Sequence, residues 1–370
     1  MIKFLYKNIL KPILFKIEAD YVHVFFLHAS SFIGRFKFLR FITKKIFLYK
    51  NEYLNTKILG LKITNPLGLA AGFDYNADLL NVAENVGFGF QTVGTITNLP
   101  YEGNKKPMLG RLPRSKSLLV NKGFKNNGID FILDKVSKKK NNIPVGISIG
   151  TTNKSYCDIK EMIEDVTNSF RKVVDSHLFD FYELNISCPN LSNITSVDSA
   201  FDTKEGFTLL LNKLSTLAIR KPLFIKMYLE KNVEETLLLV EIASSYNFVT
   251  GFIFANLVKD RSNIFFDKDE ITNAGKGNFS GKPTEEMSNN LISEVYKKYK
   301  NRFVIIGCGG VFSGFDAYEK IKRGASLVQM ITGMIYEGPT VMGDINKDLV
   351  KLLKKDGYKS IGEAVGSYYK

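Results

Sequence analysis

A short polar segment, NISCPN, follows an apolar run and ends it at residues 185–190. It brings together Asn185, Ser187, Cys188 and Asn190, and polar neighbours at the end of a strand suit a thiol that gives or takes a proton. The segment contains no histidine to activate the thiol, which argues against the Cys–His nucleophile of a protease. The alternative for Cys188 is a buried structural cysteine, a common role of free cysteine.

Lys226 stands in the middle of another apolar run, FIKMY. A lysine inside a buried strand is costly unless it is paired, so an anion or a strong acceptor is expected beside it. The alternative is an edge lysine whose ammonium reaches solvent. The sequence thus predicts that Lys226 is a functional cation near Cys188.

Small residues end several other apolar runs. Gly309-Gly310 and Thr332-Gly333 leave backbone N–H groups free to hold a phosphate, although glycine in an ordinary tight turn is the alternative. Ala71 and Gly72 would let a ligand lie close to the backbone. Further polar side chains at the ends of runs are Thr95, Ser148 and Asn256.

These residues are positioned by a regular alternation of strand-length and helix-length segments. Nearly continuous apolar runs are typical of strands buried on both faces of a parallel sheet. Eight strand–helix units over roughly 300 residues predict a (β/α)8 barrel, whose catalytic residues lie at the carboxyl ends of the strands. A doubly wound open sheet is the alternative, but the chain lacks its GxGxxG motif. The eight runs are residues 66–72, 90–97, 144–150, 181–187, 222–228, 251–257, 303–310 and 327–334.

A long insertion, residues 260–281, separates the sixth and seventh runs. Loops of this length without secondary structure are uncommon in compact domains unless they serve a function. We expect this loop to cover the active site.

The first 50 residues have a different composition, with many Phe, Leu, Ile and Lys residues. The pattern predicts two short amphipathic helices with basic residues, which can lie in a membrane interface. The alternative is a helical hairpin packed on the main domain. Recurring lysines exclude a signal peptide, and the longest uncharged run, residues 21–34, is too short to span a bilayer. The crowded phenylalanines are Phe25, Phe26, Phe32, Phe36, Phe38 and Phe41.

Bulk composition narrows the class of protein. The 370 residues are 45% hydrophobic, enough for a sizeable core, and carry a net charge of +14. Such a charge favours nucleic acid, acidic lipid or phosphorylated ligands, although a lysine-rich soluble surface is the alternative. Three cysteines fit a reducing compartment, and no Cys/His cluster has the spacing of a metal site, so no metal is expected.

The motifs NPLGLAAGFD, GFGFQTVGTIT, NISCPN, the lysine strand, GCGG and LVQMITGMIYEGP, in this order, resemble the dihydroorotate dehydrogenase family from about residue 10 to the C-terminus. The resemblance implies a (β/α)8 barrel that holds FMN and oxidises dihydroorotate to orotate in pyrimidine biosynthesis. Cys188 would be the base, taking the C5 proton while a hydride passes from C6 to N5 of FMN. Lys226 would stabilise the negative charge that develops on the flavin.

The N-terminal segment resembles that of the quinone-dependent, membrane-associated class. The resemblance implies an extension, residues 1–48, that forms a quinone tunnel on a barrel, residues 49–370. It also implies a peripheral position on the cytoplasmic face of the inner membrane, with dihydroorotate and quinone as partners. His23 and Arg111 resemble tunnel residues. The implied FMN contacts are Ala71, Gly72, Thr95, Ser148, Asn185, Lys226, Gly281, Gly310, Ile331 and Thr332, and the implied substrate contacts are Asn121, Gly123, Phe124, Asn185, Asn190 and Asn256.

The chain departs from the family pattern at the substrate pocket. The quinone class has serine as its base where this chain has Cys188, as in the soluble class. The lysine that follows AAGFD in the family, and helps to hold flavin and orotate, is Tyr75. Other departures are Leu257 for threonine, Val120 for the asparagine of the substrate loop, Ser148 for asparagine and Ala255 for threonine.

Two other functions stay open at this point. A dihydrouridine synthase is also an FMN barrel with a catalytic cysteine and a basic surface, but only about 35 residues follow the last strand, too few for its RNA-binding domain. We therefore expect no nucleic-acid partner. The other alternative is a membrane-surface flavoprotein whose substrate pocket has degenerated, as Tyr75 and Leu257 suggest. The oligomeric state does not follow from the sequence.

Overall fold

The computed structural model describes residues 1–370 except 140, 192, 194–199 and 255. Eight parallel strands close into a barrel in the order β10-β12-β13-β3-β4-β7-β8-β9. This confirms the predicted (β/α)8 fold, and each of the eight apolar runs overlaps one strand, although β10 begins two residues before its run. The eighth run ends early as a strand, because a helix begins at Thr332. The strands are β3 (Leu67–Leu69), β4 (Phe90–Ile96), β7 (Val145–Ile149), β8 (Phe181–Asn185), β9 (Leu223–Met227), β10 (Val249–Phe254), β12 (Val304–Cys308) and β13 (Leu327–Met330).

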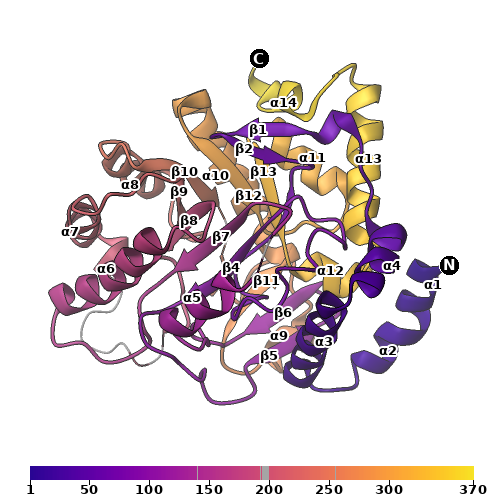
Figure 1. Ribbon diagram of the computed structural model, residues 1–370, viewed down its shortest axis with the longest axis horizontal. Helices are drawn as coiled ribbons and strands as arrows, with labels where there is room; N and C mark the ends of the chain where they lie inside the picture. The colour runs from indigo at the N-terminus through magenta and orange to yellow at the C-terminus, as the bar shows by residue number, and fades with distance from the viewer. Residues whose placement is uncertain (140, 192, 194–199, 255) are drawn as a thin grey trace.

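Helices surround the barrel, as Figure 1 shows. Their apolar faces pack on the strands, and polar side chains cap several of their first turns; in α8 an Asn232–Glu235 capping box binds both backbone N–H groups. This is the arrangement expected of amphipathic helices between buried strands. The helices are α5 (Ile129–Ser137), α6 (Ile159–Ser176), α7 (Lys204–Leu214), α8 (Val233–Ala243), α10 (Glu285–Tyr299), α11 (Gly314–Lys322), α12 (Thr332–Glu337), α13 (Val341–Lys355) and α14 (Ile361–Ala364), with short 3₁₀ turns at Glu52–Leu54, Ala200–Asp202, Lys282–Thr284, Lys300–Arg302 and Ser367–Tyr369.

Large apolar side chains fill the amino end of the barrel interior. The Phe181 ring contacts those of Phe90 and Phe224 in edge-to-face geometry. Ile253, Ile306 and Leu327 belong to the same cluster. The hairpin of β1 (Thr56–Ile58) and β2 (Leu61–Ile63) covers this end, with Ile63 in the same cluster. The polar residues of the strands therefore lie toward the opposite, carboxyl end.

A three-stranded antiparallel sheet lies at the carboxyl end of the barrel. Its strands are β5 (Leu109–Leu112), β6 (Ser117–Val120) and β11 (Asn278–Gly281), in the order β11-β6-β5. The insertion expected to be a long loop thus contains β11 and a short helix, α9 (Lys268–Thr272). Arg114 ties α9 to the β5–β6 hairpin by ion pairs with Asp267 and Asp269 at 2.7 and 3.4 Å.

The N-terminal extension contains three helical segments rather than the two expected. The first runs from Ile2 to Leu14 as α1 (Ile2–Leu5), a π-helical stretch η1 (Tyr6–Leu10) and α2 (Lys11–Leu14). The second and third are α3 (Ala19–Arg35) and α4 (Lys37–Phe47). Phe36 separates them because its backbone is extended, with φ −105° and ψ 121°. The expected domain boundary after residue 48 falls just after α4 and stays a prediction.

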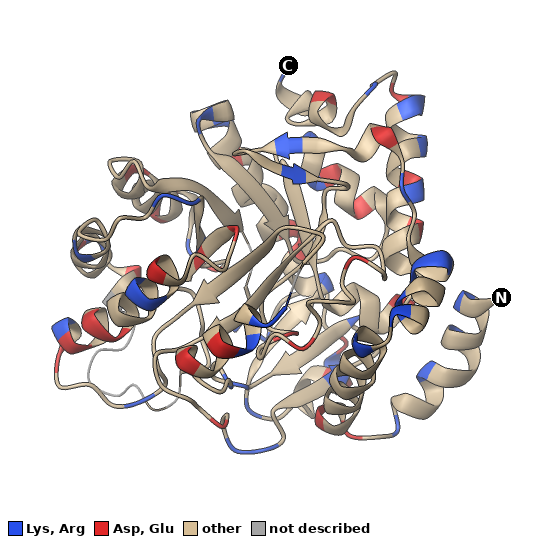
Figure 2. Cartoon of the chain, viewed as in Figure 1, with Lys and Arg blue, Asp and Glu red and all other residues tan. Residues whose placement is uncertain are grey.

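Large apolar side chains of this extension are exposed. Seventeen of the 25 exposed large apolar residues in the described part of the chain lie within residues 1–46, and Phe25, Phe38 and Phe41 are each more than half exposed. Figure 2 shows basic residues on α4 beside this surface. No helix in the described residues combines the length and apolar character needed to cross a membrane.

Candidate active site

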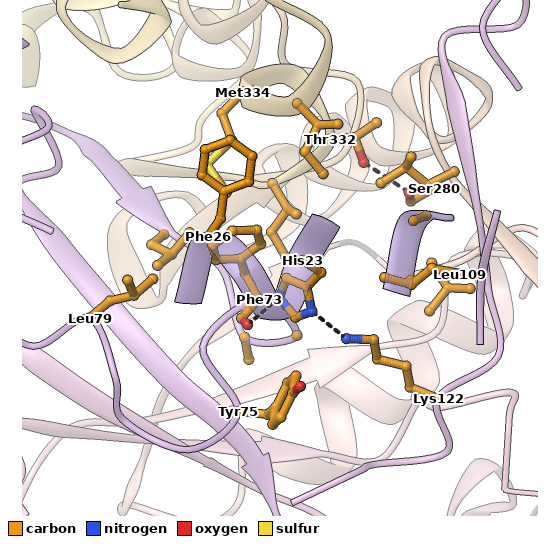
Figure 3. A pocket seen from close by; sticks show the side chains of 18 of the residues that line it. His23, Phe26, Phe73, Tyr75, Leu79, Leu109, Lys122, Ser280, Thr332 and Met334 are labelled. Carbon is orange, nitrogen blue, oxygen red and sulfur yellow. Dashed lines mark hydrogen bonds between the residues drawn. The ribbon is translucent and has the colours of Figure 1, made fainter. Parts of the chain in front are cut away.

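A single cavity of about 440 Å³ joins the N-terminal helices to the carboxyl end of the barrel. On the helical side it is lined by apolar residues such as Phe15, Val22 and Phe26. On the barrel side it reaches Asn185, Cys188 and Lys226, among others. Figure 3 shows part of the wall between these ends, with Phe26 and Met334 on one side of His23 and Tyr75 and Lys122 on the other.

A chain of hydrogen bonds, extended by one ion pair, connects four adjacent strands at the barrel end of the cavity. Ser148 Oγ donates to Glu183 Oε1 at 2.7 Å, so it accepts from Thr95 Oγ at 2.9 Å. Asn185 Nδ2 donates to Thr95 Oγ at 2.8 Å. Lys226 Nζ lies 3.7 Å from Glu183 Oε1 and completes the chain. The side chains are buried, so each hydrogen bond fixes a donor or acceptor that would be costly to leave unpaired.

The sequence analysis missed Glu183, which is buried at the centre of this chain of contacts. It is fully buried, and it supplies the anion that Lys226 was expected to need. Its second oxygen, Oε2, has no hydrogen-bond partner in the described structure. The sequence does contain a signal for Glu183. Side chains two apart on a strand share a face, and Glu183 lies between Phe181 and Asn185, which both face inward on β8. Its partner Lys226, on β9, pairs in register with Asn185 on β8.

The NISCPN segment is held in place by its own amides and by the next strand end. Asn185 Oδ1 accepts from the backbone N–H and the hydroxyl of Ser187 at 3.2 and 3.1 Å. Asn256 Nδ2 donates to the carbonyl of Ser187 and, at 2.8 Å, to its hydroxyl. Asn190 accepts from Asn278 Nδ2 at 2.6 Å, which connects the segment to β11. Three of the four predicted substrate asparagines, Asn185, Asn190 and Asn256, therefore line the same cavity with fixed side-chain orientations.

Cys188 faces the cavity at the centre of this segment. Burial raises the pKa of its thiol to about 12, while a backbone hydrogen bond to Asn190 and the charge of Lys226 act in the opposite direction. The thiol is therefore neutral at pH 7, whereas a base that takes the C5 proton must be a thiolate. The identity of the base stays a prediction.

The expected substrate loop packs directly on the NISCPN segment. Gly123 has a φ of +63°, and a Cβ atom there would lie 2.9 Å from the Asn190 carbonyl oxygen, so only glycine fits. Phe124 lines the cavity, whereas the Asn121 amide oxygen accepts from Asn104 Nδ2 at 2.9 Å and the residue does not line the cavity. Lys122, between them, does line it and was not expected to.

The expected FMN contacts fall into two groups. Ser148 lies behind Thr95 in the hydrogen-bond chain. Gly281, the last residue of β11, and Gly310, just after β12, have positive φ values of 87° and 71° and lie outside the cavity lining. Ala255 lies outside the described residues. The positions that line the cavity are Ala71, Gly72, Thr95, Asn185, Lys226, Ile331 and Thr332. All ten assignments stay predictions.

The two expected tunnel residues line the cavity at different depths. Arg111 is near the helices, where its guanidinium lies 4.8 Å from the Phe15 ring centroid and donates to the Ile17 carbonyl at 2.7 Å. His23 on α3 is buried, and its Nε2 lies 2.9 Å from the Phe73 carbonyl oxygen. His23 thus stands between the apolar and polar parts of the cavity (Figure 3).

Comparison with known proteins decides the family. The family model described as dihydroorotate dehydrogenase matches residues 53–353. The chain belongs to the dihydroorotate dehydrogenase family. A relative from Christiangramia forsetii named dihydroorotate dehydrogenase (quinone) is 33% identical, with 94% of this chain and 99% of the relative covered. One of the same name from Helicobacter acinonychis is 32% identical, with 97% and 98% covered.

A solved structure agrees with the family at the level of the fold. The DHODH of Eimeria tenella, in complex with ferulenol, is 26% identical to this chain and superposes with a TM-score of 0.82. The match covers 95% of this chain and 96% of that one, so it includes N-terminal helices as well as the barrel. The resemblance to the family that the motifs carried is therefore confirmed.

Proposed function

We propose that this protein is a quinone-dependent dihydroorotate dehydrogenase, oxidising dihydroorotate to orotate and passing the electrons to a quinone. The observation that carries the proposal is the single cavity that joins the asparagine-rich end of the barrel to the apolar N-terminal helices. A polar, anionic substrate suits the first part, and an apolar electron acceptor suits the second. Relatives that match over almost their whole length are named for this activity.

The residues present fit FMN, which the family generally binds. The cavity wall at the ends of β3 and β4 is formed by Ala71, Gly72 and Gly94, whose small size lets a flat ring approach the backbone. Buried Lys226 presents a cation to the same space. FMN bound there would supply a two-electron acceptor for substrate oxidation and a donor for the quinone.

The side chains of this protein have separate tasks in the reaction. Asn185, Asn190 and Asn256 orient the substrate through amide hydrogen bonds, because each is held by the contacts described above. Lys226 favours negative charge at its end of the cavity. Cys188 accepts the substrate proton in its thiolate form, which the charge of Lys226 favours, and the proton of the resting thiol passes to solvent water before the substrate binds.

The N-terminal helices form the acceptor side and face the membrane. Their exposed apolar residues and the basic residues of α4 suit the interface of an anionic bilayer. We therefore place the protein peripherally at the cytoplasmic face of the inner membrane, with its quinone entering between the helices.

Anaerobic mixing of the FMN-loaded protein with dihydroorotate tests the function. We expect loss of flavin absorbance, formation of orotate and return of the absorbance when a short-chain quinone is added. A yellow protein that dihydroorotate cannot bleach would instead favour the membrane-surface flavoprotein. Salt-sensitive retention of tRNA would favour a dihydrouridine synthase.

A further inference from the structure

Two buried lysine side chains line the cavity, and they differ in their partners. Lys226 lies 3.7 Å from the Glu183 carboxylate. Lys122 is 9% exposed, and the ion pairs found among the described residues do not include it. A buried ammonium without a carboxylate partner is costly, and a binding site for an anion is one reason to keep it.

Two neutral rings hold the Lys122 ammonium (Figure 3). Lys122 Nζ lies 2.8 Å from His23 Nδ1 and 4.5 Å from the centroid of the Tyr75 ring. The Phe73 carbonyl can only accept, so His23 Nε2 carries the proton and Nδ1 accepts from Lys122. Burial and the charge of Lys122 lower the pKa of His23 to about 3, so the imidazole stays neutral. The two rings therefore orient the cation without neutralising it.

The position of Lys122 is fixed relative to the substrate asparagines. The next residue, Gly123, packs against the Asn190 carbonyl, and Phe124 lines the cavity with Asn185 and Cys188. Tyr75, at the position where the family resemblance predicts a lysine, presents its ring to the Lys122 ammonium instead. Lys122, on the segment after β6, thus supplies the cation that the family resemblance predicts at position 75.

We propose that Lys122 binds the carboxylate of dihydroorotate and orotate, with His23 and Tyr75 as the residues that position its ammonium. The inference rests on the proposed function, because that function supplies the carboxylate. Lys122 then acts in substrate recognition, while the quinone binds on the far side of His23.

The test compares dihydroorotate with its uncharged methyl ester in anaerobic stopped-flow reduction of the FMN-loaded enzyme. For Lys122→Met we expect the dissociation constant of dihydroorotate to rise roughly 10- to 100-fold, the loss of one charge-assisted hydrogen bond. The dissociation constant of the ester should change far less. An equal change for acid and ester, or none for either, would overturn the proposal, as would an effect confined to the quinone KM.

Matched variants separate this role from a structural one. Lys122→Gln keeps a donor for His23 but removes the charge, so it should lose the preference for the acid even if Lys122→Met folds poorly. Tyr75→Phe keeps the ring and should bind dihydroorotate as the wild type does, whereas Tyr75→Leu should bind it more weakly. Lys106→Met is the control, because Lys106 Nζ also lies over a tyrosine ring, 5.3 Å from the centroid of Tyr21, but Lys106 does not line the cavity.

The outcome also distinguishes this inference from the proposed function. A wild-type protein that dihydroorotate fails to reduce refutes the function itself. A wild-type protein that is reduced, with Lys122→Gln keeping the full preference for the acid, refutes only the role of Lys122.

Discussion

The barrel end of the cavity and the N-terminal helices differ in where they place polar and apolar side chains. At the barrel end, polar side chains are buried, and a continuous chain of hydrogen bonds from Asn185 to Glu183 pairs most of their donors and acceptors. In the helices, apolar side chains are exposed, with Phe38 70% and Phe25 63% accessible. Each arrangement is costly in isolation: buried polar groups lose water, and exposed apolar groups order it.

The difference indicates what each region binds. At the barrel end the buried polar side chains pair with one another, and the Lys122 ammonium, which has no carboxylate partner among the described residues, is left to bind a ligand. The exposed apolar side chains of the helices can be buried only against something else, such as a lipid interface. Changes to the buried residues of the barrel end should therefore alter chemistry and stability, and changes to the exposed surface of the helices should alter membrane binding alone.

Removing the thiol is expected to have the largest effect. Cys188→Ala should slow flavin reduction by roughly 10²- to 10⁴-fold, the usual contribution of a positioned acid or base, while FMN stays bound. Stopped-flow absorbance measures the rate. Cys308→Ala is the matched control, since Cys308 on β12 does not line the cavity. A Cys188→Ala rate equal to that of the wild type would exclude Cys188 as the base.

Breaking the buried ion pair should be costly to stability. Lys226→Met leaves the fully buried Glu183 carboxylate without its cation, which we expect to cost about 3–5 kcal/mol in the free energy of unfolding. Urea denaturation of the single variant and of Lys226→Met with Glu183→Gln measures it. The double variant should recover much of the loss, and two variants of equal stability would contradict the pairing.

Exposed phenylalanines on α4 should control membrane affinity and nothing in the barrel. Replacing Phe38 and Phe41 together by serine should weaken binding to anionic liposomes roughly 10- to 100-fold, because less apolar area is buried in the interface. Flavin reduction by dihydroorotate should be unchanged. Phe131→Ser on α5, where the side chain is 47% exposed, is the control. Slower flavin reduction in the α4 variant would break the proposed separation of the two regions.

The pH dependence of substrate binding should be the smallest effect, and it tests the charge of one residue, Lys122. Burial lowers the pKa of Lys122 to about 7, and a bound carboxylate would raise it, so dihydroorotate should bind best below pH 7. Above pH 7 its dissociation constant should rise about tenfold per pH unit. Of the neighbouring groups, His23 has its pKa lowered to about 3 and Tyr75 raised to about 12, so neither titrates in this range.

The charged groups farther from the ammonium act on the same pKa. Asp20 raises the pKa of Lys122 and Lys125 lowers it. Asp20 accepts from the backbone N–H groups of Met108 and Leu109. In Lys122→Gln the dissociation constant should be flat with pH, and a slope equal to that of the wild type would assign the titration to another group.

The sequence predicted the barrel well because strand burial leaves a direct pattern of apolar runs. It predicted Lys226 as a buried cation from the same pattern. It missed Glu183 because a single acidic residue in FYELN resembles an ordinary surface position until the inward face of β8 is assigned. It missed Lys122 because the contacts of that residue come from α3 and from the segment after β3, far away in the chain.

The N-terminal helices were harder to predict in detail. Large apolar residues recur throughout residues 1–46, so the pattern did not show where one helix ends and the next begins. The break at Phe36 depends on a local extended backbone rather than on a proline or glycine. The sheet that includes β11 was missed because its partners β5 and β6 lie about 160 residues earlier in the chain.

The short helix α12 connects the two regions and constrains how the chain can vary. Its first residue, Thr332, lines the cavity, and its last, Glu337, forms an ion pair with Lys7, while the Ile335 carbonyl accepts from the Tyr6 hydroxyl at 2.6 Å. One residue inserted into an α-helix rotates everything beyond it by about 100°. An insertion or deletion here would turn either the cavity wall or the anchor of the first helix away from its contacts. Length changes should therefore be rarer in this helix than in the surface loops, even where its side chains differ.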